Sequence, residues 1–149
     1  MAKACITCGK TGGFIKDSVY VKYQNNDLCP DCAEKLMNDI DNKIIITGTD
    51  NINGYEITEY ICLESAELII ATPFIFSFSG NMTDYFDKEP ILAEKNIKKA
   101  KDCVIKKLKR IAYECGGNAI VRADIDYVNL DANRTAIIVN GTIVKLNKI

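Results

Sequence analysis

Two Cys-x-x-Cys pairs near the N-terminus constrain this sequence more than any other feature. Cys5 pairs with Cys8 and Cys29 with Cys32, and twenty residues separate the two pairs. Two residues between thiolates let one tight turn aim both sulfur atoms at a single ion, and two such pairs supply the four ligands of tetrahedral Zn²⁺. The sequence therefore predicts a structural Zn(2+) site formed by these four cysteines, in a module resembling a zinc ribbon or treble clef.

Other uses of the paired cysteines are less favoured. A thioredoxin-like redox centre has one Cys-x-x-Cys motif in a βαβ setting, not two pairs in a short module. A catalytic zinc keeps one coordination position open, whereas four thiolates close the coordination shell. A module of about 40 residues also buries little apolar surface, so metal binding would supply much of its folding free energy. We expect the ion to hold the fold together and to take no part in catalysis.

The chain lacks histidine, which bears on catalysis. Without imidazole, the usual general base and the usual partner of a nucleophilic cysteine or serine are missing. We therefore expect a protein that is not an enzyme. A thiol-dependent enzyme remains an alternative, because three of the seven cysteines lie outside the two pairs: Cys62, Cys103 and Cys115.

Charge and hydropathy exclude several classes of partner. The net charge of the chain is −1, and residues 1–43 hold six lysines against six acidic residues. Binding to nucleic acid requires a basic surface, so it is disfavoured. The N-terminus has no apolar segment typical of a signal peptide, and the apolar stretch 67–78 is shorter than the roughly 20 residues that span a membrane. We expect a cytoplasmic protein that does not bind nucleic acid or membranes.

The composition changes between residues 42 and 43, which predicts two domains. In residues 1–42, the cysteine module, we expect a strand at 18–23, a turn at 25–27, a helix from Asp31 and a polar linker over about 38–43. In residues 43–149 the patterns predict these elements in order: strands at 43–49 and 55–71, an irregular segment at 72–90, a helix at 91–115 and strands at 118–130 and 134–146. The second domain is therefore expected to be α+β, with a β-β-α-β-β order, a mostly antiparallel sheet and one long helix.

The predicted long helix has an apolar stripe and a basic surface. Its apolar residues recur at intervals of three and four, which indicates a buried face: Ile97, Ala100, Val104, Leu108, Ile111, Ala112 and Cys115. We therefore expect Cys115 in the core and the helix end at Gly116-Gly117. Eight basic residues accompany three acidic ones between Glu94 and Glu114. A solvated outer face is the favoured interpretation, and a basic surface for an acidic partner or lipid is the alternative.

Several stretches of the second domain resemble the YbjQ-like family. The most specific is the pattern that here places Gly116, Asn118, Ala119 and Asp126-Tyr127 around the start of a strand. The resemblance covers about residues 44–146. It implies a small α+β domain that assembles as a homopentamer and is described as "putative heavy-metal-binding", with no assigned activity. Together with the cysteine module, it suggests a zinc-binding, homo-oligomeric protein with an unidentified protein partner.

A second metal site would suggest heavy-metal sensing or storage instead. Two sets of ligands could form it in the second domain: Cys62, or the carboxylates of Glu67, Asp124 and Asp126 around a shared cavity in an oligomeric ring. Acidic residues on strands are mostly solvated, so ordinary surface charge is the favoured interpretation of the three carboxylates.

Overall fold

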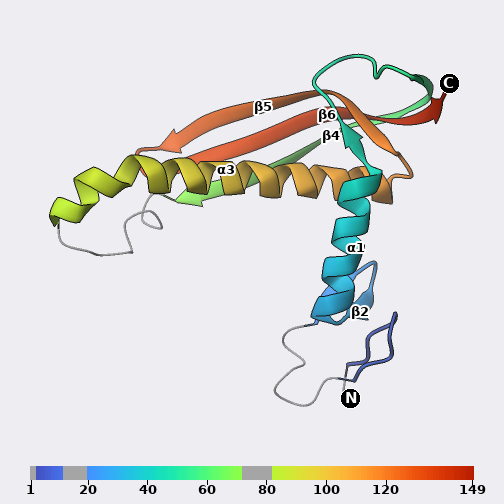
Figure 1. Cartoon of the computed structure of the whole chain (residues 1–149), viewed down its shortest axis with the longest axis horizontal. Helices are drawn as coiled ribbons and strands as arrows, with labels where there is room; N and C mark the ends of the chain where they lie inside the picture. Colours follow the sequence, from blue (N-terminus) through green and yellow to red (C-terminus); the bar gives the residue numbers. More distant parts are fainter. Residues whose placement is uncertain (1–2, 12–19, 72–81) are drawn as a thin grey trace. The chain divides into compact units, whose positions relative to one another are not determined.

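The computed structural model describes residues 3–11, 20–71 and 82–149, and these divide into two compact units (Figure 1). The first unit is Met1–Lys43 and the second is Ile44–Ile149. Helices and a mixed sheet occur together in the chain, so the predicted α+β class is confirmed. The two units are described separately below.

In the first unit, a short hairpin precedes a helix. Strands β1 (Val21–Tyr23) and β2 (Asn26–Leu28) pair antiparallel. The two residues between them, Gln24 and Asn25, have φ values of 46° and 65°. Two-residue hairpin turns favour positive φ because their twist matches that of the strands. The turn therefore lies at 24–25, one to two residues before the predicted turn.

Helix α1 (Pro30–Lys43) continues through the segment that was predicted to be a polar linker. The linker prediction for residues 38–43 was wrong. Ala33, Leu36 and Ile40 are spaced by three and four residues, and Ile40 is only 2% exposed. Since such spacing places these side chains on one helical face, their apolar stripe outweighs the polar residues around them.

The second unit is a four-stranded sheet with one long helix. Its strands are β3 (Ile45–Ile46), β4 (Tyr55–Ala71), β5 (Ala119–Asp131) and β6 (Arg134–Lys148). They are arranged in the order β3-β5-β6-β4, with β3 parallel to β5 and the other pairs antiparallel. The predicted mostly antiparallel sheet is thus found, and helix α3 (Met82–Glu114) packs on β4, β5 and β6.

Helix α3 is longer than predicted. It begins at Met82, so residues 82–90 are helical and the irregular segment predicted for them was wrong; residues 72–81 lie outside the described part of the chain. The prediction placed the start next to Pro90, which is favoured in a first helical turn and disfavoured in a helix interior. Asp84 and Asp87 precede Pro90, and acidic residues near a helix N-terminus favour starting there. No helix in the described part of the chain is long and apolar enough to cross a membrane.

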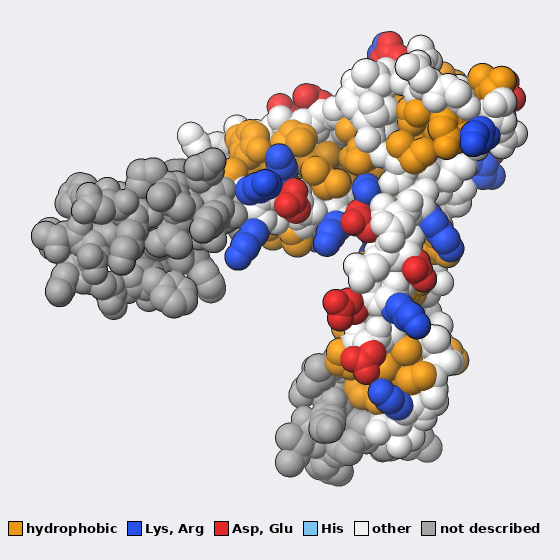
Figure 2. Space-filling model, in the orientation of Figure 1, with side chains coloured by type: hydrophobic (Ala, Val, Ile, Leu, Met, Phe, Trp, Pro, Cys, Tyr) orange, Lys and Arg blue, Asp and Glu red, His pale blue; other side chains and the backbone are white. Residues whose placement is uncertain are grey.

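The core of the second unit lies between α3 and the sheet. Val104, Leu108 and Ala112 are fully buried, which confirms the central part of the predicted helical stripe. On the sheet they are matched by buried aliphatic side chains that include Ile120, Ile137, Val139 and Ile143. The basic residues from Lys98 to Arg110 are exposed or partly exposed, and Figure 2 shows blue Lys and Arg side chains along α3.

The prediction that Cys115 lies in the core was wrong. Its side chain is exposed, since it follows the last residue of α3 and the chain turns away there. Gly116 has φ 83° and donates its N–H to the Tyr113 carbonyl at 3.0 Å, and Gly117 donates to the Ala112 carbonyl at 2.9 Å. These two bonds form a Schellman motif, which confirms the predicted helix stop and makes Cys115 the C-cap residue.

Candidate metal centre

The structure brings the four paired cysteines together. The sulfur atoms of Cys5, Cys8, Cys29 and Cys32 all lie within 4.8 Å of one another, and those of Cys8 and Cys29 are 3.7 Å apart. In a tetrahedral Zn²⁺ centre with Zn–S bonds near 2.3 Å, neighbouring sulfur atoms are about 3.8 Å apart. The donor set and its spacing therefore fit a single thiophilic ion.

A tight turn shapes the first pair. The backbone N–H of Gly9 donates to the carbonyl of Cys5 at 2.9 Å, and the N–H of Cys5 donates to the carbonyl of Lys10 at 2.9 Å. Gly9 has φ 70°, which glycine adopts without the steric cost that other residues incur. The N–H of Ile6 donates to the Asp27 carbonyl at 3.0 Å, so the turn is also bonded to β2.

The second pair lies at the start of α1. Cys29 immediately precedes the helix, and its carbonyl accepts a hydrogen bond from the N–H of Ala33 at 2.9 Å. Cys32 lies in the first helical turn. Both cysteines therefore lie at the end of α1 that carries partial positive charge.

The cysteines themselves make up much of the core of this unit. Cys5 and Cys29 are 2% and 4% exposed, and within the described residues their cluster contains two other buried side chains, Leu28 and Ala33. Four partly buried side chains pack around it: Tyr20, Tyr23, Cys32 and Leu36. Among the described residues this apolar cluster is small, and a small cluster contributes limited hydrophobic stabilisation.

The pKa values of Cys5 and Cys32 are shifted in opposite directions. A hydrogen bond from the backbone N–H of Cys29 is the main cause that lowers the pKa of Cys5 to about 6. Hydrogen bonds with the Cys29 and Cys8 sulfur atoms raise the pKa of Cys32 to about 12. Crowded sulfur atoms cannot all ionise together unless a cation neutralises them, which is the role that a thiolate-bound metal ion performs.

A second cluster of sulfur and oxygen donors lies in the other unit. The sulfur atoms of Cys62 and Cys115 and a carboxylate oxygen of Glu64 all lie within 4.8 Å of one another. Sequence reasoning named Cys62 as a possible ligand but missed Glu64 and placed Cys115 in the core. Burial is the main cause that raises the pKa of the Cys62 thiol, and the neighbouring Cys115 sulfur adds to it.

Three other candidate residues do not join either cluster. Glu67 and Asp126 both lie opposite Ile138, on strands β4 and β5 that flank β6. One strand therefore separates them, a distance of about 10 Å. Within the described residues, Glu67, Asp124 and Asp126 form no metal-capable group, and neither does the exposed Cys103 on α3.

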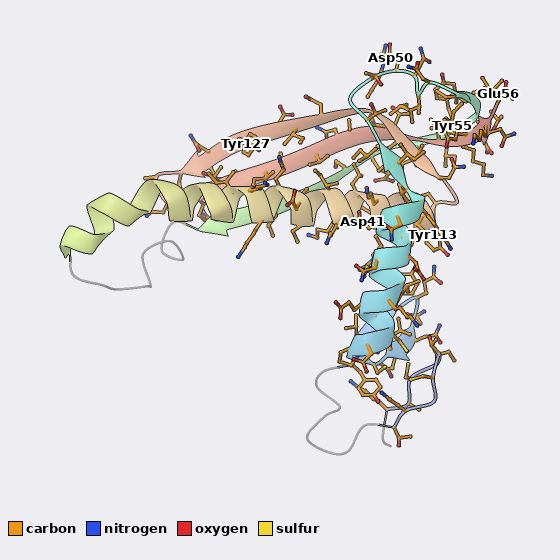
Figure 3. The ribbon with its side chains drawn as sticks, viewed as in Figure 1. Asp41, Asp50, Tyr55, Glu56, Tyr113 and Tyr127 are labelled. Atoms are coloured by element: carbon orange, nitrogen blue, oxygen red, sulfur yellow. The ribbon has the colours of Figure 1, made fainter. Side chains whose placement is uncertain are left out.

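An ion pair that the sequence did not suggest joins the β3–β4 loop to β5. Both Nε and Nη2 of Arg122 donate to the carboxylate of Asp50, the second at 2.9 Å. Figure 3 shows Asp50 on the loop that joins β3 to β4. Arg122 has φ 52° and lies where the β5–β6 register shifts, so a local bulge presents its guanidinium to the loop.

We expect this pair to make stability depend on pH in the acidic range. The Arg122 guanidinium lowers the pKa of the Asp50 carboxyl below its ordinary value in the folded state. The stabilisation is therefore present above the unfolded pKa of about 3.9 and is lost as pH falls through the folded pKa. Replacing Arg122 by Asn, which tolerates positive φ, should return the Asp50 pKa toward its ordinary value in a carboxyl NMR titration. Asp131, whose pKa is likewise lowered by Arg134, is the internal control and should not change.

Comparison with known proteins places the second unit in a family. Residues 44–147 match the YbjQ family model, whose description is "putative heavy-metal-binding". A UPF0145 protein of Bacillus anthracis is 31% identical over 103 residues, and one of Bacillus cereus is 30% identical over 103 residues. Each alignment covers 69% of this chain and 100% of the relative.

A solved structure matches the same part of the chain. It is a crystal structure of a protein of unknown function of the DUF74 family from Pediococcus pentosaceus, with 21% sequence identity and a TM-score of 0.41. The match covers 70% of this chain and 98% of that one. The family model covers well over half of the sequence, and the cysteine pairs lie before the matched region. The chain therefore belongs to the YbjQ family and carries an additional N-terminal cysteine unit.

Proposed function

We propose that this chain is a non-enzymatic metal-binding protein whose N-terminal unit holds one structural Zn²⁺ on Cys5, Cys8, Cys29 and Cys32. The observation that carries the proposal is the grouping of all four sulfur atoms within 4.8 Å. Zn²⁺ is the favoured ion because it accepts four thiolates tetrahedrally and has no redox chemistry of its own. With four sulfur ligands the coordination shell is closed, which leaves no position for a substrate.

We further propose that the YbjQ domain forms a homo-oligomer, with five copies as the family resemblance suggests. Strand β4 is 17 residues long and lies at the edge of the sheet, and among the strands that the structure describes its partner is β6. Its side chains Leu63 and Ile69 are 75% and 54% exposed in the single chain. A long apolar edge strand is a strong template for pairing with another chain, so association would cover it. Light scattering at micromolar concentration should give a mass well above one chain, and a monomer would contradict this part of the proposal.

The raised pKa of Cys62 supports a role without thiol catalysis. A cysteine nucleophile acts as its thiolate and is activated by lowering its pKa, whereas burial raises the pKa of Cys62. The proposed role is therefore that of a zinc-stabilised adaptor or scaffold. Its N-terminal unit presents a surface to a protein partner.

Metal content per chain tests the zinc proposal. Protein purified without added metal or a metal-binding tag should contain zinc by elemental analysis. The variant with Cys29→Ser and Cys32→Ser should contain one zinc ion per chain fewer than the unmodified protein. Cys103→Ser is the matched control, because Cys103 is exposed and outside both clusters. Equal zinc content in the double variant and the control would contradict the proposal, as would iron in place of zinc.

A further inference from the structure

The Cys62, Glu64 and Cys115 cluster is built from two elements that are far apart in sequence. Cys62 and Glu64 come from β4, and Cys115 follows α3. Their three donor atoms lie within 4.8 Å of one another, as the four sulfur atoms of the N-terminal unit do. Cys62 and Glu64 are partly buried, while Cys115 is exposed, so the cluster is reachable from solvent.

A bulge in β4 places Cys62 on the side of the sheet that faces α3. Tyr60 lies opposite Val144, but Cys62 lies opposite Ile143, so Ile61 is an extra residue in β4. Without it, Cys62 would lie opposite Thr142 and point to the other face. Bulges commonly re-aim side chains next to functional sites. Glu64, two residues further along, shares the face of Cys62.

The Schellman motif fixes Cys115 over the same face. The N–H of Cys115 donates to the Ile111 carbonyl at 2.9 Å, and Gly116 and Gly117 close the helix end behind it. Gly117 is pressed against β6: an added Cβ would lie 2.4 Å from the Cγ2 atom of Ile143. Since Ile143 is the residue opposite Cys62, this contact brings the end of α3 to the position of Cys62 in the sheet.

The chemistry of the three donors indicates what they would bind. Thiolates select thiophilic ions such as Zn²⁺, and a carboxylate oxygen is a common third ligand of the same ion. Three protein ligands leave a fourth position open, unlike the closed four-sulfur set of the N-terminal unit. At this position a water molecule or another ligand could bind.

We propose that Cys62, Glu64 and Cys115 form a second metal site, with two sulfur ligands and one oxygen ligand, for a thiophilic divalent cation of the Zn²⁺ or Cd²⁺ type. The site lies within the YbjQ domain and is independent of the proposed N-terminal zinc. It exchanges metal with solvent more readily than the closed site, because one ligand is exposed and one coordination position is open.

The test is a metal titration of the full-length chain, kept reduced with a phosphine that does not bind the metal. Equilibrium dialysis against Cd²⁺, followed by elemental analysis, counts the bound ions per chain. We expect two ions in the unmodified chain and in Cys103→Ser, and one in Cys62→Ser and in Cys115→Ser. Glu64→Gln should retain two sites but weaken the second by at least roughly tenfold. Circular dichroism verifies that each variant is folded.

Several outcomes would overturn the second site. One is equal Cd²⁺ content in Cys62→Ser, Cys115→Ser and Cys103→Ser. Another is a disulfide between Cys62 and Cys115 that the phosphine does not reduce in the folded chain. The variant with Cys29→Ser and Cys32→Ser separates this proposal from the N-terminal one. It should keep one Cd²⁺ per chain if the second site exists, and this ion should disappear when Cys62→Ser is added. The absence of Cd²⁺ from the double variant would overturn the second site and leave the N-terminal proposal standing.

Discussion

The variant with Cys29→Ser and Cys32→Ser is expected to unfold the N-terminal unit and leave the YbjQ domain folded. The apolar cluster of that unit is small and is itself partly made of the cysteine ligands. In zinc-finger peptides structural zinc contributes about 10–16 kcal/mol, comparable to or larger than the total stability of a typical domain. The YbjQ domain forms a separate compact unit with its own core, so we expect it to fold without these cysteines.

Hydrogen exchange and limited proteolysis measure this difference. In the double variant, and in the unmodified chain treated with a zinc chelator, backbone amides of β1, β2 and α1 should exchange at rates typical of an unfolded chain. Those of β5 and β6 should stay protected. Proteolysis should yield a resistant fragment that begins near Ile44. In the Cys103→Ser control, the backbone amides of both units should stay protected from exchange. Protected α1 amides in the double variant would show that the N-terminal unit folds without its metal ligands.

The sequence was most informative where local patterns determine structure. The long β-rich run at 55–71 predicted a strand there, and the observed β4 is Tyr55–Ala71. The two glycines at 116–117 predicted the end of α3, because glycine readily adopts the left-handed backbone conformation that follows the last residue of many helices. The spacing of the four N-terminal cysteines predicted that their sulfur atoms would meet, and the structure groups them within 4.8 Å.

The sequence was least informative where the outcome depends on contacts between distant segments. Cys115 continues the helical spacing of Leu108 and Ala112, but the helix ends at Glu114 and the next residue leaves the buried face. Only the pairing of β4 with β6 shows that Ile61 is an extra residue and that Cys62 therefore faces α3. The second cluster could not be predicted, because no motif around Cys62 encodes the bulge. Nor does a local pattern show that the end of α3 lies beside Cys62 in the fold.

The packing of α3 on the sheet brings Cys115, at the end of the helix, to Cys62 and Glu64 on β4. We expect the loss of this packing to cause a large decrease in the free energy of unfolding. Leu108 is fully buried between α3 and the sheet, and one of its methyl groups lies close to where a Gly141 side chain would be. Replacing Leu108 by Ala removes three carbon atoms and leaves a cavity in a close-packed core. The expected loss is about 2–5 kcal/mol in the free energy of unfolding.

Thermal or denaturant unfolding at a fixed protein concentration measures this loss, because association makes stability depend on concentration. Leu108→Ala should lower the Tm of the YbjQ domain by at least about 10 °C. The matched control is Leu130→Ala, the same chemical change at a side chain that is 47% exposed, with an expected effect within about 0.5 kcal/mol. Equal losses in the two variants would show that α3 does not supply the core. If Leu108→Ala also weakens Cd²⁺ binding at Cys62 and Cys115 while Leu130→Ala does not, the packing of α3 on the sheet holds the two cysteines together.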